Sequence, residues 1–210
     1  ELVFESGVVG FVGRNWSGVV QQRIDCGNAV IGPGFIDLDA LSDIDSTILV
    51  FDNGPAWRKG RVWSHQYAQR PREALDDDSL DLAKRWAWLQ LLRNGITTAL
   101  PISSIIYRAW SETVEEFERA IDIAAEVGLR VYLGPAYCGG RTLVDAEGRI
   151  SLHLDEVRGE AGLRDSIAFI HRHDGAQNGL VRGLLAPDRI EGCPESLLRA
   201  SRDAALELGV

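Results

Sequence analysis

The chain has 210 residues, of which 45% are hydrophobic and 25% are charged, a composition typical of a globular protein with a buried core. Its formal net charge is -9, and so acidic a chain repels phosphate backbones, which argues against nucleic acid as a partner. No stretch approaches the roughly 20 apolar residues that span a bilayer, so we expect no membrane partner.

The N-terminal 32 residues have the pattern of short strands and turns. Apolar segments at residues 2–4, 8–13 and 19–24 are separated by glycine-containing turns, and no helical spacing is present. We therefore expect residues 1–32 to form strands of a small β-layer, part of a β-sandwich, without a helix.

From residue 33 onward, apolar strands alternate with amphipathic helices. In the first helix, Leu82, Trp86 and Leu89 fall at helical spacing and Ser79 is a plausible N-cap. Pro194 is expected at the first position of the last helix. The predicted strands lie near 35–39, 96–100, 129–134 and 180–186, and the predicted helices at 79–93, 112–127, 161–173 and from 194 onward.

Glycine marks the passage from helix to the next strand. A left-handed glycine after a helix turns the chain back toward the sheet. Repeated units of this kind predict an α/β fold with neighbouring parallel strands, either half of a barrel or a small doubly wound sheet. A full (β/α)₈ barrel takes about 250 residues, so residues 33–210 are expected to be the N-terminal half of a TIM-type barrel. The four glycine positions are Gly95, Gly128, Gly179 and Gly209.

Five segments, in order, resemble the amidohydrolase superfamily. Residues 25–37, D-C-G-N-A-V-I-G-P-G-F-I-D, are similar to the run that opens the family's barrel. Residues 94–98, N-G-I-T-T, and 124–130, A-A-E-V-G-L-R, are similar to its second and third strands. Residues 185–187 with the following helix, and residues 5–13, resemble the fourth strand and the small β-sandwich of the cytosine-deaminase and chlorohydrolase branch.

This resemblance implies a catalytic zinc or iron ion at the mouth of the barrel, where it activates a water for attack on a C–N or C–Cl carbon. The family's first two ligands form His-x-His, and the matching positions here are Asp39 and Leu41. Leucine cannot bind a metal, which leaves Asp39 as the candidate ligand. The family's other ligands would lie beyond Val210, in the missing C-terminal half of the barrel, which is therefore an expected partner.

The long segment between residues 42 and 77 is the candidate substrate loop. Loops of this length in compact domains are usually lids or binding loops. Its aromatic side chains are interspersed with cations, a combination suited to a planar or anionic small molecule. We expect Trp57, Trp63 and His65 to bind substrate.

Other candidate residues have simpler explanations. His171 and His173 are expected at a helix end, on the side of the barrel away from the catalytic mouth. Asp37 is either catalytic or a partner of backbone amides. The insertion at 137–160, which contains His153, could reach over the mouth. The cysteines, far apart and odd in number, match no zinc or redox spacing and indicate a reducing cytoplasm.

The sequence thus predicts a cytoplasmic, metal-dependent hydrolase of a non-peptide C–N bond, of the amidohydrolase or deaminase type. It would act on a small molecule, and a homo-oligomer is possible. Two alternatives stay open. One is a non-catalytic barrel that has lost its metal site together with His-x-His, and the other is a small α/β binding domain that is complete in itself.

Overall fold

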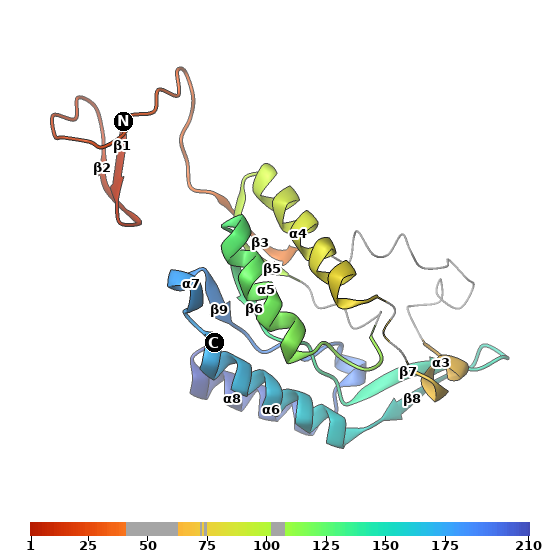
Figure 1. Ribbon diagram of the computed structural model, residues 1–210. Helices are drawn as coiled ribbons and strands as arrows, with labels where there is room; N and C mark the ends of the chain where they lie inside the picture. Colours follow the sequence, from red (N-terminus) through yellow and green to blue (C-terminus); the bar gives the residue numbers. More distant parts are fainter. Residues whose placement is uncertain (41–62, 72, 74, 102–107) are drawn as a thin grey trace. The chain divides into compact units, whose positions relative to one another are not determined.

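The structure, a computed structural model, describes residues 1–40, 63–71, 73, 75–101 and 108–210 (Figure 1). The chain divides into two compact units, Glu1–Pro33 and Gly34–Val210, and each is treated by itself. None of the helices among the described residues is both long enough and apolar enough to cross a membrane.

The first unit contains an antiparallel hairpin of β1 (Leu2–Glu5) and β2 (Val8–Val12). Ser6 and Gly7 form its two-residue turn with positive φ angles of 52° and 78°, the backbone that matches the twist of a tight hairpin. The expected strand at 19–24 is wrong, because residues 13–33 contain neither strand nor helix. Membership of a larger β-sandwich stays a prediction.

The second unit is organised around a four-stranded parallel sheet, and this confirms the predicted strands and their order. The register pairs Ala99 with Val131, and Val131 with Val181. Sequential neighbours joined by helices are the pattern of repeated right-handed crossovers. The strand order is β3 (Phe35–Ala40), β5 (Ile96–Pro101), β6 (Arg130–Leu133) and β9 (Val181–Gly183).

The predicted helices are present with shifted starts. All four predicted glycines are left-handed, with φ between 73° and 84°. The main helices are α4 (Asp77–Arg93), α5 (Val114–Val127), α6 (Glu156–His173) and α8 (Glu195–Leu208), and the short ones are α7 (Ala176–Gly179) and the 3-10 turn η3 (Ile190–Gly192).

Capping side chains explain the shifted starts. The N-cap of α4 is Asp76, not Ser79, because the Asp76 carboxylate accepts the Ser79 N–H at 2.9 Å. Helix α6 begins well before residue 161, since Asp155 caps it by accepting the Arg158 N–H at 3.1 Å. Pro194 is the N-cap of α8 rather than its first helical residue.

One face of the parallel sheet carries the core. Val131, Leu133 and Val181 are buried there among apolar side chains of α4, α5 and α6, including Trp88, Phe117 and Phe169. The alternating positions Arg130, Tyr132 and Arg182 lie on the opposite face and are exposed. Within the described ranges, helices α4, α5 and α6 therefore cover this face of the sheet.

The buried face of α4 differs from the one that its leucine and tryptophan spacing indicates. Leu82, Trp86 and Leu89 are exposed, while Leu80 and Trp88 are buried with Ala87 and Lys84. Ala87 is buried, and Lys84 is buried with it in an ion pair with Glu116 on α5. On α5, the apolar residues Phe117, Ile121 and Ala124 are buried.

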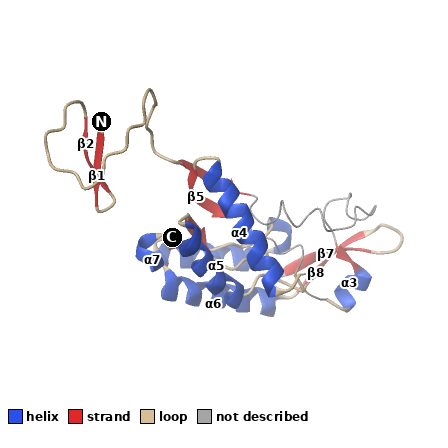
Figure 2. Ribbon diagram, turned by 45° about the horizontal axis from the view of Figure 1, so that its top comes forward, coloured by secondary structure: helices blue, strands red, loops and turns tan. Residues whose placement is uncertain are grey.

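A second, three-stranded sheet joins the loop after β3 to the insertion after β6 (Figures 1 and 2). The insertion folds as an antiparallel hairpin, and β4 pairs in parallel with its first strand. Helix α3 (His65–Gln69) follows β4 directly. The strands are β4 (Trp63–Ser64), β7 (Gly140–Val144) and β8 (Ile150–Leu154).

Candidate functional site

The carboxyl end of β3 carries two aspartates in different roles. The Asp39 N–H donates to Asp37 Oδ1 at 3.0 Å, so Asp37 is a partner of the backbone, one of the two roles that the sequence allowed. Asp39 is exposed. It is therefore the carboxylate of this strand end that is open to a ligand. Leu41 lies outside the described residues.

A buried acid connects the chain after β5 to the chain after β6. Glu112 stands next to Thr113, the N-cap of α5. Its Oε2 accepts a hydrogen bond at 2.9 Å from the buried N–H of Ala136. The interaction fixes two of the segments that leave the carboxyl edge of the parallel sheet, where barrel enzymes place their catalytic groups.

The segments after β6 and β9 continue side by side beyond the strands. The Tyr137 N–H donates to the Ala186 carbonyl at 3.1 Å, and the Asp188 N–H donates to the Tyr137 carbonyl at 2.8 Å. The Tyr137 hydroxyl donates to Ser201 Oγ at 2.7 Å, and burial raises the pKa of Tyr137 to about 12. This tyrosine stays protonated at neutral pH and anchors the segment against α8.

A cluster of buried charges lies between α4, α5 and the segment before α5. Glu116 on α5 is buried and its Oε1 binds both Lys84 Nζ on α4 and, at 2.6 Å, Arg108 Nη2. Arg108 also lies 3.9 Å from Glu73, whose carboxylate accepts the Ala109 N–H at 3.0 Å. The cluster joins the segment before α4 to the segment that follows β5. The sequence pattern missed it, because Lys84 and Glu116 are residue types that usually face water.

Trp63, a predicted substrate-binding residue, packs against a buried arginine. The Arg141 guanidinium of β7 lies 4.6 Å from the Trp63 ring centroid and 5.4 Å from that of Trp110, distances typical of cation–π contacts. Trp110 Nε1 donates to the Cys138 carbonyl at 3.2 Å, and the Arg158 guanidinium lies 4.9 Å from the same ring. Arg141 therefore holds the loop after β3 against the insertion after β6.

The other predicted residues are distributed over several elements. His65 is the exposed first residue of α3, and Trp57 lies outside the described residues. Asp39 and Trp63 belong to different sheets. His171 and His173 are in the last turn of α6, as predicted, and His173 Nε2 lies 3.4 Å from Glu118 Oε1.

The buried cysteines are unsuited to nucleophilic chemistry. Cys138 and Cys193 are free thiols in the interior, whereas Cys26 is exposed. Burial raises the pKa of the Cys193 thiol to about 11 and also raises that of Cys138. Because the thiolate is the reactive form, both side chains act as small apolar residues at neutral pH.

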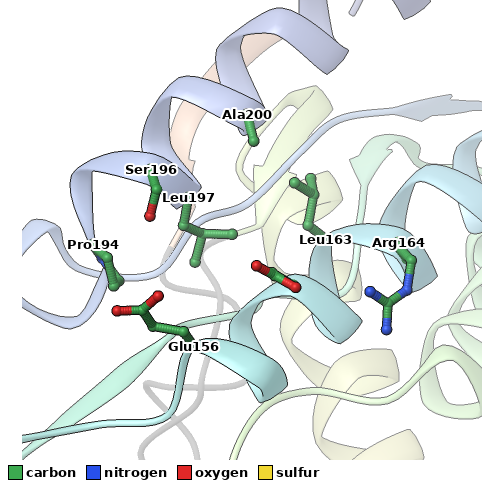
Figure 3. Close-up of a pocket in the computed structure, with 8 residues that line it drawn as sticks. Glu156, Leu163, Arg164, Pro194, Ser196, Leu197 and Ala200 are labelled. Carbon is green, nitrogen blue, oxygen red and sulfur yellow. The ribbon is translucent and has the colours of Figure 1, made fainter.

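A hollow of about 300 Å³ opens between the first turns of α6 and α8 (Figure 3). Its floor is apolar, formed by Leu163, Leu197 and Pro194, and Glu156, Glu160 and Arg164 line its α6 side. Both helices follow segments that leave the carboxyl ends of β6 and β9, and the lining residues Leu163 and Leu197 pack in one buried cluster with Tyr137.

The described residues do not fit a complete metal site. Among residues 1–40, 63–71, 73, 75–101 and 108–210, no group of three or more His, Cys, Asp or Glu side chains is placed to hold a metal ion. A stable zinc site takes three or four protein ligands. Asp39 alone is one carboxylate, so we derive no chemical step through a metal from these residues.

Comparison with solved structures shows a shared fold. A guanine deaminase from C. acetobutylicum with bound guanine superposes with a TM-score of 0.56 at 14% identity, covering 85% of this chain and 38% of that one. An amidohydrolase from an environmental sample of the Sargasso Sea gives 0.55 at 16%, covering 97% and 42%. Atrazine chlorohydrolase from Arthrobacter aurescens, complexed with zinc and atraton in a mutant form, gives 0.53 at 16%, covering 85% and 39%.

These likenesses lie in the fold and not in the sequence. No family model matches the chain, and no curated protein is significantly similar to it. The chain spans 38% to 42% of the length of the three structures, so it corresponds to less than half of each of those proteins. The comparison establishes an α/β fold with a parallel sheet that is shared with these three structures.

Proposed function

We propose that the protein is a metal-dependent hydrolase that cleaves a non-peptide C–N bond of a small molecule, of the amidohydrolase or deaminase type. The observation that carries the proposal is the parallel sheet covered by helices on one face, with an exposed aspartate at the carboxyl end of its first strand. This is where barrel enzymes place their chemistry. The fold likeness to a guanine deaminase and a zinc-bound chlorohydrolase supports it.

In this proposal, residues 34–210 form the first half of a barrel, and further strands complete it. Asp39 supplies one oxygen ligand to a divalent metal, zinc or iron, and the other ligands come from outside the described residues. The segments after β5, β6 and β9 form the near wall of the site. Trp57, Trp63 and His65 would contact substrate from the loop after β3, in a cytoplasmic enzyme.

The test combines activity with metal content. We expect Asp39→Ala to lower ammonia release from an accepted substrate, screened from guanine and related heterocycles, by at least about 100-fold, since loss of even an outer partner of a metal ligand costs about 10–100-fold. Metal content measured by elemental analysis should fall in parallel. Asp165→Ala, at an exposed position on α6, serves as the control and should change neither quantity.

A second candidate function is a non-catalytic barrel. It is favoured by the sequence, which has Asp39 and Leu41 at the two positions where the family it resembles has His-x-His. A protein of this kind would bind a small molecule without turning it over. If Asp39→Ala alters neither metal content nor activity, and the unaltered protein carries no stoichiometric transition metal, the hydrolase proposal is wrong and the non-catalytic function is supported.

A further inference from the structure

Two of the chain's three Asn-Gly pairs lie in the described part of the structure, at Asn94-Gly95 and Asn178-Gly179. The third, Asn53-Gly54, lies outside the described residues. In such a pair the backbone nitrogen of the glycine can attack the side-chain amide carbon of the asparagine, because glycine has no Cβ to obstruct the approach. Both described asparagines are exposed, so accessibility alone does not distinguish them.

Hydrogen bonds at the end of α4 hold the Asn94-Gly95 pair in place. Asn94 is the C-cap of this helix, and its side-chain nitrogen Nδ2 donates to the Gln90 carbonyl at 2.8 Å. The Gly95 N–H donates to the Leu92 carbonyl at 2.9 Å, and strand β5 begins at the next residue. The amide group that would have to leave and the nitrogen that would have to attack are therefore both engaged at the helix end.

The Asn178-Gly179 pair lies in a turn whose backbone is strained. Gln177, Asn178 and Gly179 have φ angles of 54°, 56° and 84°, which makes three left-handed residues in succession. This geometry is unfavourable for residues that carry a Cβ, and glycine alone adopts it freely. The Gly179 N–H donates to the Gly175 carbonyl at 3.1 Å, while the Asn178 side chain forms no hydrogen bond with another described residue. A strained turn without a side-chain anchor opens more readily than a capped helix end.

We propose that Asn178 is a site of spontaneous deamidation, and that the fold protects Asn94 from the same reaction. The Gly179 nitrogen loses its proton and bonds to Cγ of Asn178, the Cγ–Nδ2 bond breaks, and Nδ2 leaves as ammonia with that proton. Water then opens the resulting succinimide ring at either of its carbonyl carbons. The product at this position is aspartate or isoaspartate, and the steps together consume one water and release one ammonia.

The isoaspartate product alters the chain just before β9. Its main chain contains one additional carbon atom, two residues before Leu180, whose carbonyl accepts the Val131 N–H at 2.8 Å. The next residue, Val181, is buried, and its carbonyl accepts the Gly175 N–H at 2.9 Å. Both products add a negative charge, but isoaspartate also changes the spacing between these hydrogen bonds. We therefore expect isoaspartate, and not aspartate, to weaken the pairing of β9 with β6.

Peptide mapping of protein aged at pH 8 tests the proposal. Trypsin releases Asn178 in residues 173–182 and Asn94 in residues 94–108, each as the one asparagine of its peptide. Deamidation raises the mass of a peptide by one unit, so each site is followed by itself. We expect Asn178 to react at least about tenfold faster than Asn94, roughly the factor that a side-chain hydrogen bond to the backbone contributes to local opening.

The matched control is the same comparison in the unfolded chain. In guanidinium both asparagines precede glycine without a fold to distinguish them, so their rates should agree to within about threefold. Asn178→Gln should abolish the early mass increase of residues 173–182, because the longer side chain would have to close a six-membered ring. Equal rates at the two sites of the native protein, or a native ratio no larger than the unfolded one, would overturn the proposal.

Urea unfolding tests the consequence for β9. Asn178→Asp carries the charge of the products without the additional chain atom, and aspartate tolerates left-handed geometry, so its midpoint should match that of the unaltered protein. The isoaspartate form, separated from aged protein by ion exchange, should unfold at a lower urea concentration than Asn178→Asp. Equal midpoints for these two forms would overturn the proposed effect on β9.

Discussion

At the scale of single residues, burial decides which polar groups are chemically available. Asp37 and Asp39 are two residues apart on β3, yet the first serves a backbone amide and the second is exposed. Their alternation along a strand predicts that they share a face, but the hydrogen bond that distinguishes them depends on the local backbone. The sequence allowed two roles for Asp37, catalytic residue or partner of backbone amides. The hydrogen bond from the Asp39 N–H shows the second role.

The cysteines give a prediction at the same scale. With the native protein at pH 8, a thiol-specific disulfide reagent should modify Cys26 rapidly, while Cys138 and Cys193 should react only after unfolding in guanidinium. Both interior thiols are buried, and burial raises the pKa of Cys193 to about 11, so almost no thiolate is present. The number of thiols released per chain measures this, and Cys26→Ser should remove the fast phase. Two or more fast thiols in the native protein would contradict it.

At the scale of elements, the sequence predicted the strands and helices of the parallel sheet because glycine and periodicity are local signals. All four helix-to-strand glycines are left-handed, and the strands of this sheet are neighbours in chain order, β3-β5-β6-β9. The buried face of α4 could not be predicted. Leucine spacing alone indicated Leu82, Trp86 and Leu89, whereas burial of Lys84 depends on Glu116, 32 residues away in the chain.

The close approach of the segments after β6 and β9 gives an element-scale prediction. A Cβ added at Gly134 would lie 1.9 Å from the Leu184 carbonyl oxygen, which is backbone and cannot move without separating the two segments. Gly134→Ala should therefore destabilise the protein by at least about 2 kcal/mol, as overpacking does. Urea unfolding measures the change.

The matched control is Gly32→Ala. A Cβ at Gly32 would meet nothing within 4 Å, and no positive φ is present there. This variant should change the free energy of unfolding by less than about 0.5 kcal/mol. Equal effects of the two substitutions would show that the segments after β6 and β9 do not pack as closely as described.

At the scale of the whole molecule, long-range contacts decide the candidate site. The three-stranded sheet joins Trp63 to a hairpin nearly 80 residues later in the chain. Pattern analysis treated the two segments as separate loops, since a two-residue strand such as β4 leaves no periodic signal. Long-range pairing of this kind cannot be read from composition or spacing. The candidate site is therefore less predictable from the sequence than the sheet that carries it.

The buried charge cluster yields the last prediction, because it joins α4, α5 and the segments before them. Replacing Glu116 by Gln removes the one buried negative charge that Lys84 and Arg108 share, and leaves both cations in the interior. Breaking a buried ion pair from one side costs about 3–5 kcal/mol, so we expect Glu116→Gln to lower the free energy of unfolding by about 3 kcal/mol or more. Glu118→Gln on the same helix removes only partly exposed pairs with Arg172 and His173, and should cost less than about 1 kcal/mol. If urea unfolding finds the two substitutions equivalent, the cluster is solvated rather than buried, and it contributes no more to the pairing of α4 with α5 than their more exposed ion pairs do.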